Sequence, residues 1–317
     1  MKSVTAKTTP APATLSAPQK HRPLLKYWDL YIMLVPALVF LLVFKYTPMY
    51  GVVIAFKDYN IIQGVMKSPW VGLQHFRELF AFDEFPKVVR NTLMISLMKL
   101  CLGFPAPIVL ALLLNELRIA VFKRSVQTIT YLPHFISWVV IGGLAVDLLS
   151  PNSGIVNKLI QLFGFEPVFF MSDEKLFRWI LVFSDIWKEA GWGAIIYLAA
   201  LLGINEELFQ SATVDGAGRL KQIWHIALPG IRSTIIVLLL LRLGNVLEAG
   251  FEQVLAMYNP TVYEVADIID TYVFRVGLGT MQFGLTTAAG LFKSVIGCVL
   301  LVAANFLARK MGEDGIF

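Results

Sequence analysis

Eight charged side chains lie inside long apolar stretches of the sequence, where a charge is costly unless it faces a protein interior or a water-filled path. Asp185 and Lys188 share a helix face at i, i+3, so we expect ion pairs to account for part of this charge. None of the eight has the histidine or cysteine partners that nucleophilic or metal chemistry needs. The eight residues are Lys99, Asp185, Lys188, Glu189, Arg242, Glu248, Glu252 and Lys293.

A second pattern suits the binding of a polar solute. Asn245, Glu248 and Glu252 recur at i, i+3, i+7 and predict a polar stripe along one helix face. Aromatic faces beside polar side chains are a common lining for a sugar. Trp187 and Trp192 supply such faces on the preceding apolar segment, although tryptophans also gather at the membrane interface. The candidate lining residues are Trp187, Trp192, Asn245, Glu248, Phe251, Glu252 and Gln253.

The sequence has no phosphate-binding loop of the form GxxxxGK[ST]. Its nearest approach, residues 290–294, lacks the second glycine and lies in an apolar stretch. The four histidines and two cysteines form no metal-ligand spacing. We therefore expect no catalytic residues, no metal and no cofactor in this chain, and no ATPase activity of its own.

The composition indicates an all-α protein that crosses a membrane several times. Hydrophobic residues make up 57% of the chain and charged residues only 15%, against about a quarter charged in soluble domains. The net charge of +5 does not suggest nucleic acid, because the basic residues flank apolar segments. A bilayer core needs roughly 20 apolar residues per helix. Six such spans are expected in residues 27–317, at about 30–55, 89–115, 126–150, 177–203, 230–257 and 281–308.

The distribution of lysine and arginine predicts the orientation of these spans. Basic residues dominate the start of the chain, the loops after the second and fourth spans, and the end, whereas the other loops balance bases with acids. Both termini are therefore expected on the cytoplasmic side of the lipid bilayer. Residues 1–26, rich in Ala, Pro, Thr and Lys, are expected to be a disordered cytoplasmic tail.

Residues 204–229, between the fourth and fifth spans, predict two short amphipathic helices. Asn205 is a good N-cap for the first helix, which carries acids in its first turn. Asp215-Gly216 interrupts the pattern, and Gly216 can adopt the positive φ that other residues resist. Leu220, Ile223, Trp224 and Ala227 then form the apolar stripe of a second helix. Pro229 is expected in the first turn of the next span.

This loop resembles the EAA loop of binding-protein-dependent ABC importer permeases. The segment ELFQSATVDGAGRLKQIWHIALPG keeps the order Asp-Gly-Ala, aromatic, Ile and Leu-Pro at fixed spacing, while Gln210-Ser-Ala replaces the Glu-Ala-Ala triplet. A glutamate contact therefore does not carry over to Gln210. Arg219 is either a charge at the rim of a partner contact or a topology signal only. The residues assigned to the loop are Gln210, Ala212, Asp215, Gly216, Ala217, Arg219, Trp224, Ile226, Leu228 and Pro229.

The resemblance extends over nearly everything from residue 27 onward. YTPMYGVVIAFKDYN, SPWVGLQHFRELF and WKEAGWGAIIYLAALLGI are similar to the MalF-like carbohydrate permeases, and within them to the oligosaccharide and polysaccharide branch that includes the alginate importer. The family implies a bacterial cytoplasmic membrane, a second homologous permease subunit and an extracytoplasmic solute-binding protein that delivers a carbohydrate. It also implies a separate dimeric ATPase, which binds ATP and Mg²⁺ and grips residues 204–229, so that its closure tilts the spans as a rigid body.

Two other classes of protein remain open at this point. An ion-coupled secondary transporter is compatible with six spans and inner charges, although paired Gly/Pro-broken half-helices are not evident in the sequence. A multi-pass membrane enzyme lacks any supporting constellation of catalytic residues. Dependence of uptake on ATP and on a second permease separates the importer from both.

Overall fold

Every regular element in the described residues, 28–310, is helical, apart from one antiparallel bridge between Lys57 and Trp70. This computed structural model divides into two units, residues 1–50 and 51–317, which are described separately. The predicted tail 1–26 lies outside the described residues. The all-α class is confirmed.

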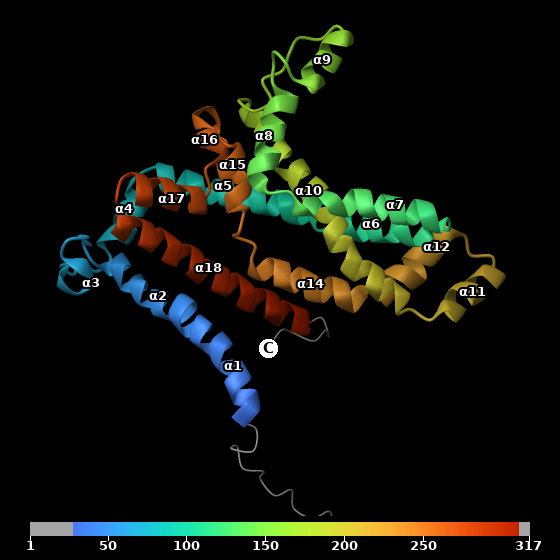
Figure 1. Ribbon diagram of the computed structural model, residues 1–317, viewed down its shortest axis with the longest axis horizontal. Helices are drawn as coiled ribbons and strands as arrows, with labels where there is room; N and C mark the ends of the chain where they lie inside the picture. Colours follow the sequence, from blue (N-terminus) through green and yellow to red (C-terminus); the bar gives the residue numbers. More distant parts are fainter. Residues whose placement is uncertain (1–27, 311–317) are drawn as a thin grey trace, which may run out of the picture. The chain divides into compact units, whose positions relative to one another are not determined.

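The helix bounds follow the chain order in Figure 1. In the first unit they are α1 (Trp28–Leu41), a π-helical turn (Leu42–Tyr46) and α2 (Thr47–Met49), followed by a 3-10 segment (Tyr50–Phe56) that enters the second unit. The next are α3 (Gly64–Lys67), α4 (Gln74–Ala81), α5 (Glu84–Met98), a π turn (Lys99–Gly103), α6 (Pro105–Glu116), α7 (Ala120–Tyr131), a 3-10 turn (Leu132–Phe135), α8 (Trp138–Leu149) and α9 (Ile155–Leu162). The remaining elements are α10 (Glu174–Leu202), α11 (Glu206–Val214), α12 (Arg219–Gln222), a π turn (Ile223–Ala227), α13 (Leu228–Gly230), α14 (Arg232–Gly244), α15 (Phe251–Met257), a 3-10 turn (Pro260–Val262), α16 (Tyr263–Ala266), α17 (Ile269–Gly279) and α18 (Phe283–Lys310).

Three helical stretches are long and apolar enough to cross a membrane unaided. They are Trp28–Phe56, Glu84–Glu116 and Phe283–Phe306, and they match the first, second and sixth predicted spans. Three further candidates are pairs of helices bent by more than 40° at a short break, so the total reaches up to six. The predicted number of spans is therefore compatible with the fold, but half of them are not straight rods.

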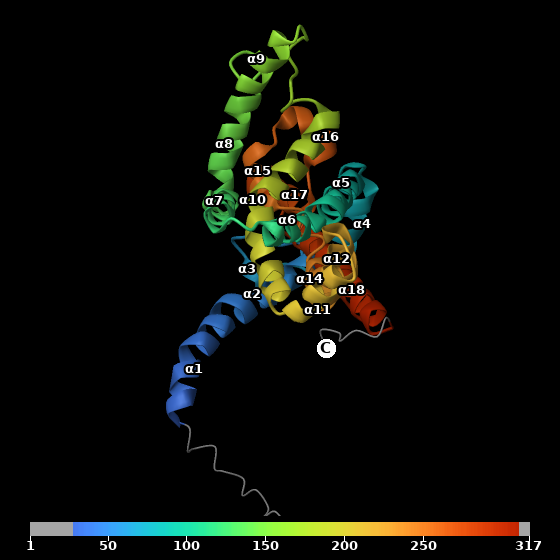
Figure 2. The same cartoon turned by 90° about the vertical axis from the view of Figure 1, so that its right-hand side faces the viewer.

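The third predicted span, 126–150, is not a single helix but two helices with a sharp bend between them. α7 and α8 meet at 103° across a short 3-10 turn. Pro133 lies in that turn, where its ring and missing N–H prevent a continuous α-helix. The hydroxyl of Ser137 then caps α8 by accepting a hydrogen bond from the Val140 N–H at 3.4 Å. Figures 1 and 2 both show α8 and α9 projecting from the bundle.

The fifth predicted span, 230–257, is also interrupted. α14 ends at Gly244, and helix resumes only at Phe251 after a stretch in which Gly250 has a φ of +96°. The helical stripe predicted for Asn245, Glu248 and Glu252 is therefore absent. Pro229 precedes a 62° bend between Arg219–Gly230 and Arg232–Gly244, so it ends the loop helix instead of opening the next span. The interruptions at Pro133 and Gly250 were not expected from the sequence.

Candidate coupling loop and membrane cavities

The first loop helix, α11, begins as its sequence predicts. The Asn205 side chain accepts a hydrogen bond from the Glu207 N–H at 3.0 Å, which satisfies one of the free donors of the first turn. The helix ends at Val214, Asp215 is its C-cap, and Gly216 takes a φ of +76°. The Ala217 N–H then donates to the Ala212 carbonyl at 2.8 Å. The predicted pair of short helices with a left-handed glycine between them is confirmed.

A glutamine holds the two loop helices together. The amide of Gln222 donates to the Thr213 hydroxyl at 3.0 Å and to the Ala217 carbonyl at 2.9 Å, so one side chain of the second helix fixes the end of the first. Arg219 forms an ion pair with Glu116 at the end of α6, at 3.5 Å. Sequence reasoning missed Gln222, because a bond from a side chain to a turn leaves no periodic signal.

The loop is anchored on one side and exposed on the other. Ala227 and Ile231 are buried in a core with residues of α6 and α10. Four large hydrophobic side chains of the loop are exposed: Leu208, Val214, Leu220 and Trp224. Val214 is 88% exposed and Trp224 70% exposed, so the predicted apolar stripe is divided between the core and solvent. Large apolar side chains exposed on a polar loop are candidates for a contact surface.

The remaining predicted loop residues are arranged around this division. Gln210, Asp215 and Gly216 are exposed, whereas Ala212, Ala217, Ile226 and Leu228 are half-buried. Figure 1 shows the loop helices α11 and α12 at one end of the second unit, with α4 and α17 toward the other. The exposed loop residues are therefore well removed from that opposite end.

A cavity of about 630 Å³ lies between the interrupted fifth span, α17 and α18. Phe251 and Phe274 form part of its wall, with ring centroids 5.7 Å apart. Glu248 lines it together with an ion pair in which the Lys293 ammonium lies 2.6 Å from Asp270. Its volume and its mixture of aromatic and charged walls are those of a small-molecule site.

A second cavity, of about 310 Å³, lies beside α10 and is lined by Asp185, Glu189, Trp192 and Arg242, among others. One face of Trp192 is already stacked on His134, with ring centroids 4.5 Å apart. His134 in turn lies 2.9 Å from Glu189. Different residues of the predicted solute path therefore line the two cavities.

The structure separates the seven predicted lining residues into three groups. Trp192, Glu248 and Phe251 line the two cavities, and Asn245 lines a narrow gap beside Ser96 and Lys99. Trp187 and Glu252 are exposed and line neither cavity. Gln253 is fully buried, and its amide donates to the Leu181 carbonyl at 2.7 Å and to the Ser184 hydroxyl at 2.8 Å. Gln253 is thus a structural residue.

The ion pairs inside the spans differ from the expected pair of Asp185 with Lys188. Asp185 pairs instead with Lys99 of the second span at 3.1 Å, and Arg242 of the fifth lies 4.0 Å away. Lys188 donates to the carbonyl of His134 at 2.5 Å and lies over the ring of Trp138. These partners come from distant parts of the sequence, and helical spacing cannot identify them.

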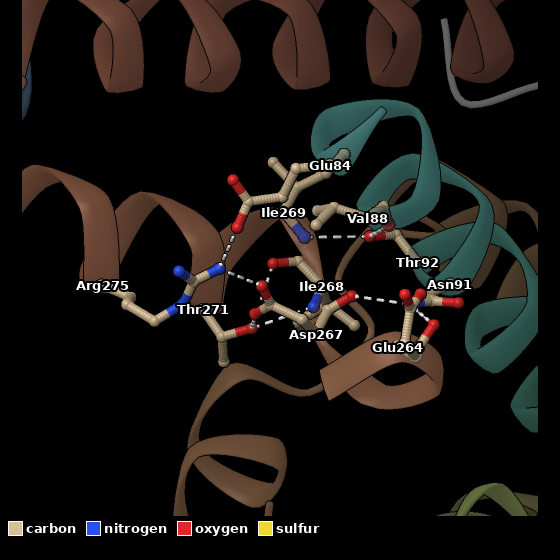
Figure 3. Close-up of polar contacts among 10 residues, drawn as sticks. All are labelled: Glu84, Val88, Asn91, Thr92, Glu264, Asp267, Ile268, Ile269, Thr271 and Arg275. Atoms are coloured by element: carbon tan, nitrogen blue, oxygen red, sulfur yellow. Dashed lines mark hydrogen bonds and ion pairs between the residues drawn. The ribbon is translucent and has the colours of Figure 1, made fainter. Parts of the chain in front are cut away.

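A polar cluster joins α5 to the segment 264–275 (Figure 3). The Arg275 guanidinium bridges Glu84 at 2.8 Å and Asp267 at 2.6 Å. Asp267 also accepts a hydrogen bond from the Thr271 hydroxyl at 2.6 Å. Burial alone lowers the pKa of Arg275, but the two carboxylates outweigh it and raise the pKa above its ordinary value. Arg275 therefore stays charged and fixes α17 to α5.

Replacing Arg275 by methionine is expected to destabilise the protein by about 2–3 kcal/mol, because it leaves the carboxylate of Asp267 buried without its cation. The side chain of Asp267 is only 4% exposed, whereas Arg275 is 32% exposed, which reduces the effect from that of a fully buried pair. Thermal unfolding of the purified chain measures the loss. Lys87→Met is the matched control, because Lys87 pairs with Glu264 at the surface. Equal effects of the two variants would contradict this account.

Residues 103–313 match the model of the family described as binding-protein-dependent transport system inner membrane component. Among curated proteins of Bacillus subtilis (strain 168), the polygalacturonan/rhamnogalacturonan transport system permease protein YteP is 47% identical and covers 100% of both chains. Protein LplB of the same strain is 48% identical over 91% of each chain.

A solved structure is similar over most of the chain. It is the crystal structure of a bacterial alginate ABC transporter in complex with an alginate pentasaccharide-bound periplasmic protein. The match has a TM-score of 0.85 and 44% identity and covers 92% of this chain and 97% of the other. The helical spans, the loop between α10 and α14 and these similarities agree, and the chain belongs to the family of binding-protein-dependent transport system inner membrane components.

Proposed function

We propose that the chain is one of two permease subunits of an ABC importer that carries an oligosaccharide across the inner membrane. The observation that carries this proposal is the full-length similarity to a permease named for the transport of polygalacturonan and rhamnogalacturonan. The similar crystal structure contains a periplasmic protein loaded with an alginate pentasaccharide, which supports a solute-binding protein as a further partner. Family membership favours this class over the ion-coupled transporter and the membrane enzyme.

In this proposal the exposed face of the loop receives the motion of a separate ATPase dimer, which binds ATP and Mg²⁺. The distribution of basic residues supports a cytoplasmic location for the loop and both termini. Leu220 and Trp224 supply apolar contact area, and the bonds of Gln222 keep the two helices at a fixed angle. A rigid projection of this kind can transmit a push to the spans that carry it.

The oligosaccharide passes through the interior in contact with the two cavities. Phe251 and Phe274 offer rings to the apolar faces of sugar units, and Glu248 accepts hydrogen bonds from hydroxyl groups. Trp192 offers its remaining face in the smaller cavity. The similarity of this chain to a permease named for polygalacturonan and rhamnogalacturonan, and to an alginate transporter, favours fragments of these polysaccharides as the first candidates to test.

Co-purification followed by reconstitution tests the proposal. The chain, tagged at its C-terminus, is expressed with its genomic neighbours, and the proteins that accompany it are identified by mass spectrometry. We expect a second permease and an ATPase with a phosphate-binding loop, and ATP-dependent uptake of oligosaccharides once the solute-binding protein is added. A chain that purifies alone and moves a solute without ATP would overturn the proposal.

A further inference from the structure

The described residues of the second unit form three separate apolar cores, and two of them share α10. The far core consists of Ile95, Phe177, Leu181, Ala249, Val254, Met257, Val262, Ala266 and Ile268. The loop-side core consists of Ala111, Leu114, Ala194, Tyr197, Leu198, Leu201, Ala227 and Ile231. On α10 the two cores are separated by the stretch from Leu181 to Ala194, roughly 20 Å at 1.5 Å per residue. The far core and the loop-side core are therefore packed independently.

Charged side chains fill the interval between these cores. Lys99, at 3% exposure, pairs with Asp185, and Arg242 approaches the other oxygen of the same carboxylate. One turn further along α10, Glu189 lies 3.7 Å from Lys188 and 2.9 Å from His134. Each carboxylate thus has two cationic or imidazole partners. We call Lys99, His134, Asp185, Lys188, Glu189 and Arg242 the polar layer.

Three spans lose their regular α-helical hydrogen bonding in this same interval. The second has the π turn Lys99–Gly103, the third has the break 132–137, and the fifth has the break 245–250. A break leaves backbone carbonyls without their helical donors. Lys99 donates to the freed carbonyl of Ala249 at 2.9 Å and to the Gln253 side chain. Lys188 likewise donates a hydrogen bond to the backbone carbonyl of His134 at the break in the third span.

The apolar cores and the polar layer respond differently to a bending force. An apolar core is close-packed, so shearing it opens voids that cost free energy. Ion pairs in the polar layer can be exchanged, because Asp185 and Glu189 each have two possible partners. At least one partner of each carboxylate lies on a neighbouring span. The second, third and fifth spans already lack there the α-helical bonds that resist bending, whereas α10 crosses the layer as one unbroken helix. Deformation of the unit therefore concentrates in the polar layer.

We propose that the polar layer is a flexure plane, about which the loop-side core and its loop tilt as one body relative to the far core during transport. Lys99 and Lys188 are positioning residues that keep the interrupted backbones bonded while the angle changes. This inference rests on the proposed coupling role of the loop. It replaces the expectation that all spans tilt as a single rigid body.

Spin-label distances in the reconstituted full complex test the flexure. Leu93 and Phe183 report on the far half, and Val109 and Val237 on the loop-side half, since all four side chains are exposed. Between the ATP-free and the ATP-trapped complex, we expect the pairs 93/183 and 109/237 to stay constant and the pair 93/237 to change. Three constant distances in a complex that transports would overturn the flexure plane. Absence of ATP-dependent uptake in the unlabelled complex would instead contradict the proposed function.

A charge substitution tests the positioning role. Lys99→Met is expected to lower uptake per ATP hydrolysed by about 5- to 150-fold, the usual range of coupling between two sites. Lys99→Met/Asp185→Asn removes both charges and guards against misfolding, and we expect it to assemble while remaining uncoupled. Lys87→Met, in the surface pair with Glu264, should keep the normal ratio. A normal ratio in an assembled Lys99→Met or double variant would overturn the role of Lys99.

Discussion

Replacing Gly191 by alanine is expected to lower the stability of the native fold sharply. A Cβ atom at Gly191 would lie 1.9 Å from the carbonyl oxygen of Thr130 and 2.4 Å from its carbonyl carbon. Both obstructing atoms belong to the backbone of α7, so no side-chain rotation relieves the overlap. The two helices must separate, and we expect a loss of about 3 kcal/mol or more, at the upper end of overpacking effects.

Thermal unfolding in detergent, followed by size-exclusion chromatography, measures this loss. Gly290→Ala in α18 is the matched control, because no atom lies within 4 Å of the added methyl group. Alanine is also the better helix former, so the control should unfold at the wild-type temperature or slightly above it. A Gly191→Ala protein that unfolds within a few degrees of Gly290→Ala would show that α7 and α10 do not approach as described.

Replacing Gly216 by valine is expected to abolish most ATP-dependent uptake while leaving insertion in the membrane intact. The φ of +76° lies in the left-handed region, where a β-branched residue is strained. The local cost is only about 1–2 kcal/mol, and there is open space for the side chain. The strain therefore changes the angle between α11 and α12 rather than the fold, and the exposed face of Trp224 is presented wrongly to the ATPase.

Asparagine provides the matched control for valine at this position, because it adopts left-handed conformations far more readily. We expect Gly216→Asn to keep most of the uptake and Gly216→Val to lose about 5- to 150-fold, the range of typical coupling free energies. Uptake into vesicles and ATPase activity are measured on the same preparation. If both variants transported alike, the left-handed backbone at Gly216 would not be required for coupling.

Local patterns in the sequence were sufficient for much of the architecture. The apolar runs of the second and sixth spans are long and hydrophobic enough to identify on their own, even though they contain Lys99 and Lys293. The two loop helices were predictable because Asn205 and Gly216 act within a few residues of their own positions. Features of this kind depend on neighbouring residues in the chain, which the sequence displays directly.

The interruptions in the spans depend on contacts between distant residues and could not be predicted in this way. The break at Gly250 is stabilised by Lys99, which lies 150 positions from the Ala249 carbonyl that it binds. Composition favoured a continuous helix through this region. The same reason explains why Gln253 was expected to face a solute and is instead buried against Leu181 and Ser184. Pro133 was the one local warning of a break in the third span.

The pairing of Lys99 with Asp185 has a consequence for how the chain enters the membrane during its synthesis. The second span is made before the fourth, so Lys99 reaches the bilayer while its counter-ion has yet to be translated. A lysine at the centre of a span raises the free energy of membrane insertion by about 2.5–3.5 kcal/mol. Each leucine or isoleucine lowers it by about 0.3–0.6 kcal/mol. Leu110 and the run of three leucines from Leu112 to Leu114 help to offset that cost. The apolar excess of the second span thus serves insertion first and packing later, when Asp185 arrives to neutralise the lysine.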